Sequence, residues 1–420
     1  MSIADEAPKP AFRLSMLIYD TRYRSLTIQV VVFLLVMAGA AWLIDNTARN
    51  LQALGKDFNF GFLWNRAGYD ISQRLVEYTN DSTHGRAMLV GLLNTLLVAF
   101  LGCIAATVLG VFIGVLRLSP NWLAARLMTV YVEVFRNVPL LLWILMIYAV
   151  FTEVMPPPNA FRPNAEGVTA AQMVLGDSVA FTNRYTAIPD PLFSRSLGNI
   201  DLGIFLVSVD LLAILAVLTG SWWVNRRLLR HATAVQEATG LRPVTWWKSL
   251  LIWLVPLAVL KVALGFHLGY PELKGFNFTG GINVSNSFVA LWLALSLYTG
   301  AFIAEIVRAG ILAISRGQTE AAYALGLRPG RTMSLVILPQ ALRVIVPPLI
   351  SQYLNLTKNS SLAIAVGYLD LRGTLGGITL NQTGRELEAI LLMMLIYLAL
   401  SLAISGVMNI YNASVRLKER

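Results

Sequence analysis

Side chains that could do chemistry are few and scattered in this sequence. The three histidines, His84, His231 and His267, lie far apart along the chain, and the single cysteine, Cys103, sits in an apolar run. A metal centre or a histidine-based catalytic group needs several such side chains at short, regular spacing. Gly55-Lys56 lacks the first glycine and the hydroxyl residue of a phosphate-binding loop. The sequence therefore predicts a non-catalytic protein, with no metal and no cofactor bound by this chain.

The charged residues inside apolar segments are the next candidates. Asp210 and Lys261 fall in two consecutive apolar segments joined by a short basic loop. Both are expected about 9–10 Å below the external end of their segments, at 1.5 Å per helical residue. We expect them to form an intramembrane ion pair that closes a helical hairpin, with a coupling-ion site as the alternative.

Two further pairs have the spacing of neighbours on a helix. Glu133 and Arg136 are three residues apart, as are Glu305 and Arg308. Side chains at this spacing lie on the same helix face. The two pairs either stabilise their own helices or serve as part of a gate or an interface near the cytoplasmic edge.

A segment of about thirty residues follows Arg308 and is unlike a simple connector. Thr319 can cap a short helix over 320–325, and Gly326 can take the left-handed conformation that ends it. A turn at Pro329-Gly330 and a second short helix from Thr332 are expected next. The two alanines, 321 and 322, would leave a smooth face for another protein, unless the segment is a chance amphipathic turn at the membrane surface.

The elements that must position these residues are membrane helices. Hydrophobic residues make up 56% of the 420 residues and charged residues 13%, which excludes disorder and a disulfide scaffold and is too little charge for a soluble surface. Apolar stretches long enough to cross a bilayer predict an all-α integral membrane protein with about eight spans. They lie near 25–44, 88–115, 131–151, 203–224, 249–267, 288–308, 341–365 and 387–411.

The basic residues give the expected orientation. Lys and Arg are denser in the termini and in the loops on the same side, so both termini are predicted to be cytoplasmic. The net charge of +10 is then a cytoplasmic coat, and nucleic-acid binding is not expected. Residues 152–202 would form an external cap, either a solvated decoration or a docking surface for an external partner.

The segment after Arg308 resembles the EAA motif of ABC importer permeases. The matching residues are Glu320, Ala321, Ala322, Gly326, Leu338 and Pro339, with Val336 in the usual isoleucine position. The resemblance implies the MetI-like transmembrane fold and a coupling helix that seats on a cytoplasmic ATPase, which binds ATP and Mg²⁺. It further implies a bacterial inner-membrane importer with a second permease subunit and a periplasmic binding protein.

Three other segments are similar to the polar amino-acid subfamily, and the layout resembles its large general L-amino-acid (Q-type) subunit. They start at Tyr131, Tyr298 and Lys358. Pro347-Pro348 are expected to break the seventh span just before the last of them. The resemblance implies a translocation path at Arg136, Pro139, Glu305, Lys358, Asn359, Ser360 and Ser361.

The predicted domains follow from this comparison. A five-helix permease core would comprise 85–151 and 288–415, separated by an insertion at 152–287 with the cap and an accessory helix pair. A cytoplasmic tail (1–24), an accessory helix with an external segment (25–84) and a C-terminal tail (416–420) complete the chain. The predicted function is import of polar or diverse L-amino acids. An ion-coupled secondary transporter is the alternative, with a non-transporting scaffold third.

Overall fold

The computed structural model describes residues 16–53, 55, 57–163, 168–203 and 206–415, so most of the predicted N-terminal tail and all of the C-terminal tail lie outside the described residues. The chain divides into two compact units, 1–62 and 63–420. The first contains α1 (Met16–Tyr19) and the long apolar helix α2 (Thr21–Ala53). The short helix η1 (Gly61–Trp64) stands at the boundary.

The second unit has a helical core built around two long, tightly packed helices, α3 (His84–Leu116) and α8 (Asn286–Leu312). Small residues permit the close approach: a Cβ at Gly110 would lie 2.6 Å from the Cβ of Ile303, and one at Gly114 would lie 2.7 Å from the carbonyl oxygen of Ala304. Membrane helices gain stability from such contacts because lipid gives no hydrophobic drive for their association.

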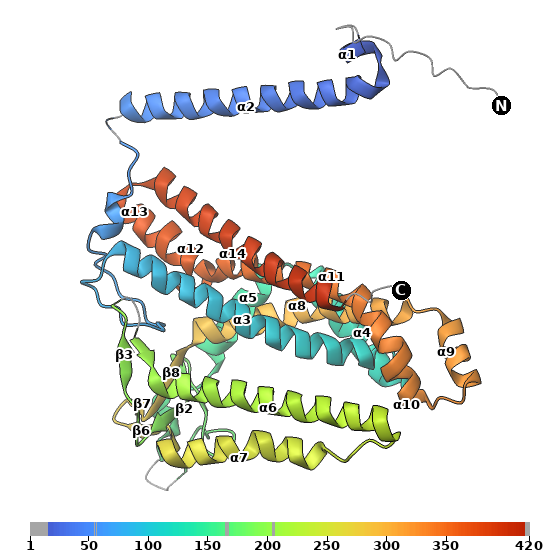
Figure 1. The fold of residues 1–420 in the computed structure, drawn as a ribbon. Coiled ribbons are helices and arrows are strands. Elements are labelled where there is room, and N and C mark those ends of the chain that lie inside the picture. The colour runs from blue at the N-terminus through green and yellow to red at the C-terminus, as the bar shows by residue number, and fades with distance from the viewer. Residues whose placement is uncertain (1–15, 54, 56, 164–167, 204–205, 416–420) are drawn as a thin grey trace, which may run out of the picture. The chain divides into compact units, whose positions relative to one another are not determined.

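Three more segments pack around this pair (Figure 1). They are α4 (Trp122–Asn137), α5 (Leu140–Ala149), with its π-helical end η2 (Val150–Val154), and α11 (Leu338–Asn359), which continues as the 3-10 helix η5 (Ser360–Val366). After η5 the chain forms α12 (Leu371–Gly373), η6 (Thr374–Thr379) and α13 (Leu380–Thr383), and it ends with α14 (Glu386–Val415).

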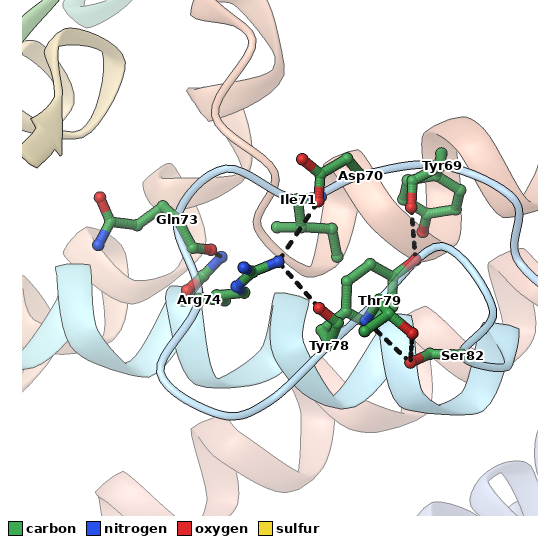
Figure 2. A network of polar contacts seen from close by, with 9 residues as sticks. Tyr69, Asp70, Ile71, Gln73, Arg74, Tyr78, Thr79 and Ser82 are labelled. Atoms are coloured by element: carbon green, nitrogen blue, oxygen red, sulfur yellow. Dashed lines mark hydrogen bonds and ion pairs between the residues drawn. The ribbon is translucent and has the colours of Figure 1, made fainter. Parts of the chain in front are cut away.

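Residues 63–83, which the sequence assigns to the accessory part, pack onto the start of α3. Ile71 and Tyr78 form a buried cluster with Val90. A local network holds the loop, in which the hydroxyl of Tyr78 donates to the carbonyl of Tyr69 at 3.0 Å and Arg74 donates to the carbonyl of Tyr78 at 2.8 Å (Figure 2).

The insertion contains two long helices and a β-sheet. Helices α6 (Val209–Thr239) and α7 (Trp246–Leu264) run side by side as a hairpin (Figure 1). The 3-10 turn η3 (Pro158–Phe161) precedes the strands. Strand β2 (Tyr185–Phe193) pairs antiparallel with β1 (Ala180–Phe181), β5 (Phe266–Gly269) and β8 (Gly281–Ser285). Two small ribbons, β3 (Asn199–Asp201) with β4 (Leu206–Ser208) and β6 (Glu272–Lys274) with β7 (Asn277–Thr279), complete the cap.

The described residues contain six helices long and apolar enough to cross a membrane, or seven if one bent pair forms a single span. These figures differ from the predicted eight in two places. The predicted span at 131–151 is not straight, because α4 and α5 meet at 104°. The predicted span at 203–224 begins with strand β4, and the helix that follows, α6, is not among the six, since its apolar half leads directly into Asn225, Arg226 and Arg227.

Candidate functional site

The predicted coupling segment is an exposed helical turn at one end of the core (Figure 1). Helix α9 (Arg316–Ala324) begins after Ser315, so it starts earlier than predicted and Thr319 lies within it rather than at its cap. Gly326 has φ +76°, as predicted, and the amide of Leu327 donates to the carbonyl of Ala322 at 3.1 Å. This left-handed ending satisfies carbonyls of the last turn.

The motif's two alanines face different ways, which corrects the smooth face predicted for both. Ala322 is buried at 3% exposure, whereas Ala321 is exposed. Tyr323 near the end of α9 and Leu325 just after it are also exposed. Exposed apolar side chains that lie together can seat a protein partner.

The chain is helical without interruption from Pro329 into α11, after a non-helical turn at 325–328 that follows α9. Helix α10 starts at Pro329, not at Thr332, and continues through the π-helical turn η4 (Met333–Ile337) into Leu338 and Pro339. Proline has no N–H to donate, so one backbone hydrogen bond of the helix is lost. The π-helical turn just before the proline accommodates this break in the hydrogen-bond pattern. The coupling helix α9 is therefore joined to a core helix through one short turn and a continuous helix.

The two predicted ion pairs have different outcomes. Arg308 donates to Glu305 at 2.7 Å, as expected, but the side chain of Arg117 at the end of α3 also binds this carboxylate. The sequence indicated no specific role for Arg117. Glu133 instead accepts from Asn137 at 3.2 Å, and the guanidinium of Arg136 lies 5.3 Å from the ring centroid of Phe302.

The predicted pair between Asp210 and Lys261 is wrong. The Asp210 carboxylate is buried at the start of α6 and accepts from the Ser196 hydroxyl at 2.5 Å and the Leu197 amide at 2.8 Å. Lys261 lies in the last turn of α7, with its Nζ 6.0 Å from the ring centroid of Phe266. Asp210 holds Ser196 and Leu197 to the first turn of α6, whose cap is Ser208, because these N–H and O–H donors are nearer than an amine across the hairpin.

The predicted translocation residues lie at two irregular places in the core. Pro139 stands at the bend between α4 and α5, one turn beyond Arg136. Lys358 and Asn359 end α11, and Ser360 and Ser361 begin η5. The prolines at 347 and 348 do not break the helix as predicted; the change of helix type comes at Ser360, after them.

These two irregular places are close in space. Leu140 and Ile144 of α5 belong to the same buried cluster as Ala363 and Val366 of η5. Around them Ser360 is fully buried, its hydroxyl donating to the carbonyl of Thr357 at 2.8 Å, while Lys358 is exposed. Broken helices of this kind place polar groups at the inside of a membrane protein.

Comparison with known proteins identifies the class. Residues 211–417 match the binding-protein-dependent transport system inner membrane component. The chain is 66% identical, over the full length of both proteins, to the glutamate/glutamine/aspartate/asparagine transport system permease protein BztB of Rhodobacter capsulatus. It is 45% identical to the general L-amino acid transport system permease protein AapQ of Rhizobium johnstonii, over 98% of this chain and 96% of that one.

A third relative is also named as an amino-acid transport permease. The putative amino-acid ABC transporter permease protein YhdX of Escherichia coli is 43% identical over 94% of this chain and 95% of its own length. The chain therefore belongs to the family of binding-protein-dependent inner membrane transport components, among the amino-acid ABC importer permeases. It is a multi-pass membrane protein and a transport component.

Proposed function

We propose that this chain forms half of the translocation path of a bacterial inner-membrane importer and takes up the acidic amino acids and their amides. The substrate class follows the 66% identical relative, whose name gives glutamate, glutamine, aspartate and asparagine. A second, homologous permease supplies the other half of the path. A periplasmic binding protein delivers the substrate, and both termini of this chain are cytoplasmic.

The observation that carries the proposal is the coupling segment. Its exposed residues include Ala321 and Leu325, and the turn after α9 leads through α10 and η4 into α11. A cytoplasmic ATPase dimer that closes on ATP and Mg²⁺ would push on Glu320–Gly326. Because only the short turn at 325–328 separates α9 from the continuous helix that starts at Pro329, the movement would reach the end of α11, where Lys358–Ser361 lie. Rigid elements of this kind transmit small displacements to a distant site.

The proposed path runs between the α4–α5 bend and the α11–η5 junction, where Arg136, Pro139 and Lys358–Ser361 lie. The exposed cation of Lys358 suits a substrate that carries carboxylates. Glu305 is bound to two arginines, so we assign it to holding helices together at the edge of this path.

The test uses the purified importer complex with its ATPase. Ala321→Trp adds bulk to an exposed face and is expected to lower substrate-stimulated ATP hydrolysis and uptake in proteoliposomes at least tenfold, with loss of ATPase co-purification. The matched control, Gly317→Ala on the same helix, has open space around its new Cβ and is expected to keep both activities. Undiminished, ATP-independent uptake by Ala321→Trp that an uncoupler abolishes would identify an ion-coupled transporter instead.

A further inference from the structure

The accessory hairpin contains a groove of about 520 Å³ between α6 and α7. Its wall on α6 consists of Val217, Gly220, Ser221 and Val224, which recur every three or four residues and so share one helix face. Its wall on α7 consists of Leu251, Ile252, Val255 and Pro256, which recur in the same way. The groove is thus an apolar channel that runs along both helices, and its shape and chemistry suit a hydrocarbon chain.

Both walls continue into a basic residue at the same end of the hairpin. On α6 the next position of the stripe is Arg227, seven residues after Gly220, and on α7 the preceding position is Lys248, seven residues before Val255. Positions seven apart lie about 20° from one another around a helix. Arg226 lies well off this stripe. One cation from each helix therefore stands at the mouth of the groove.

The two cations are available to an external anion. Among the described residues neither Arg227 nor Lys248 has an ion-pair partner, and both are exposed. The guanidinium of Arg227 lies 3.5 Å from the ring centroid of Trp223, and the Nζ of Lys248 lies 5.4 Å from that of Trp247. Stacking on an aromatic face leaves the N–H donors in the guanidinium plane free for phosphate oxygens.

One residue of the groove, Ser221, and its neighbour one helical turn further on, Asn225, carry polar atoms without partners in the part of the chain that the structure describes. The Ser221 hydroxyl and the Asn225 side-chain oxygen are buried and make no hydrogen bond among the described residues, and Ser221 is only 5% exposed. A buried hydroxyl that makes no hydrogen bond costs about 1–3 kcal/mol. Ester and glycerol oxygens sit between the chains and the phosphate of a phospholipid, and Asn225 has the matching height on α6, between the end of the apolar wall at Val224 and the cation of Arg227.

We propose that this hairpin binds one anionic phospholipid, with an acyl chain in the α6–α7 groove and the phosphate between Arg227 and Lys248. Along α6 the apolar wall is followed by Asn225 and then by Arg227, which matches the order of chain, glycerol ester and phosphate in the lipid. The paired tryptophans hold the cations at the level of the headgroups. The site rests on the membrane location of the family and is independent of the proposed substrate and coupling.

The test measures lipid retained by the purified full-length chain in its importer complex. Native mass spectrometry, after exchange into detergent with dioleoylphosphatidylglycerol or dioleoylphosphatidylcholine, is expected to show preferential retention of phosphatidylglycerol. The double variant Arg227→Gln/Lys248→Gln should lower this retention at least tenfold. The matched control Arg226→Gln, a neighbouring cation 5.1 Å from the ring centroid of Trp222, should change it less than twofold.

A third variant tests the groove itself. A Cβ added at Gly220 would have no atom within 4 Å, so Gly220→Leu can fold while its side chain fills the channel, and retention of both lipids should fall. Equal retention of the two lipids, equal loss for Arg226→Gln and for Arg227→Gln/Lys248→Gln, or unchanged retention in Gly220→Leu would each overturn the proposal. So would a photo-crosslinker at Val255 that captures a polypeptide in native membranes, since the groove would then seat another helix.

Discussion

At the residue scale, Asp370 is the most unusual ionisable group outside the spans. It is fully buried just before α12, where its carboxylate accepts from the Gly373 amide at 2.8 Å and from the Tyr397 hydroxyl at 3.2 Å. Burial raises the pKa of this carboxyl to about 7, against the smaller, opposing effect of these hydrogen bonds. Asp370 lies in the connection between η5 and α12, and this connection packs against α3. There the Leu371 amide donates to the Thr95 hydroxyl.

Replacing this carboxyl should change how stability depends on pH. The folded chain holds the Asp370 proton up to about pH 7, whereas an unfolded carboxyl loses it near 3.8, so this group's stabilising contribution is lost as pH rises between these values. Asp370→Asn keeps the hydrogen bonds without the charge. We expect its thermal midpoint in detergent to fall less than that of the unaltered chain between pH 5 and pH 8. The exposed Asp81→Asn should leave that fall unchanged.

The Glu305 carboxylate gives a second prediction at this scale. The Arg117 side chain is only 8% exposed, so Glu305→Gln leaves a nearly buried cation without its partner. We expect a loss of about 3 kcal/mol in the free energy of unfolding, at the lower end for a broken buried pair, because Glu305 itself retains some exposure. Arg308→Gln should cost less, since Arg308 is 33% exposed.

A double-mutant cycle provides the control for this pair. If Arg117→Gln/Glu305→Gln loses as much stability as the two single variants together, the two side chains do not interact in the folded protein. Unfolding in denaturant, followed by tryptophan fluorescence of the purified chain in micelles, measures all four proteins. A double variant more stable than the Glu305→Gln single variant is the expected result.

At the element scale, the close contact between α3 and α8 depends on glycines, which have no Cβ to keep the two helices apart. A Cβ at Gly110 would lie 2.6 Å from Ile303 and 2.9 Å from the Gly300 carbonyl, so the helices would have to move apart. We expect Gly110→Ala to destabilise the chain by about 1–3 kcal/mol, although alanine is the better helix former. Gly406→Ala in α14 has open space around it and should be neutral or slightly stabilising in the same unfolding assay.

The elements also show what the sequence could predict. The long helices α2, α3, α8 and α14 follow from apolar length alone, and Gly326 follows from its place after a run of good helix formers. The β-sheet of the cap was missed because its strands are short and pair across the insertion, β2 with β8 from nearly a hundred residues away. Such pairing leaves little local signal.

The candidate site was predictable to a similar extent. The positions of Lys358–Ser361 at a helix irregularity were expected, but the irregularity was placed at the wrong residues. Tertiary packing carries the helix through Pro347 and Pro348, since buried Ile345, Val346 and Ile350 hold both sides of the prolines in the core. The ion pair from Arg117 to Glu305 joins residues 188 positions apart in the sequence. The local spacing of charges along one helix cannot predict such a contact.

At the scale of the whole molecule, the second unit carries different structural elements at its two ends. The cap strands gather at one end of the helices, whereas α9 and α10 extend at the other (Figure 1). The second half of α6, with Arg226, Arg227 and Arg230, and the loop that follows it lie at the end of the hairpin away from the cap strands β4 and β5. Basic loops remain in the cytoplasm during insertion. The cap should therefore be periplasmic and the coupling segment cytoplasmic.

Cysteine labelling tests this orientation for the entire chain. In a Cys103→Ser background, which removes the single cysteine, Lys274→Cys places a thiol on the exposed cap ribbon and Gly317→Cys places one on exposed α9. A membrane-impermeant maleimide applied to intact spheroplasts should label position 274 and reach position 317 only after permeabilisation. The reverse pattern would put the EAA-like segment outside, where no ATPase could act on it. Labelling of both positions before permeabilisation would show that the helices between them do not seal a bilayer.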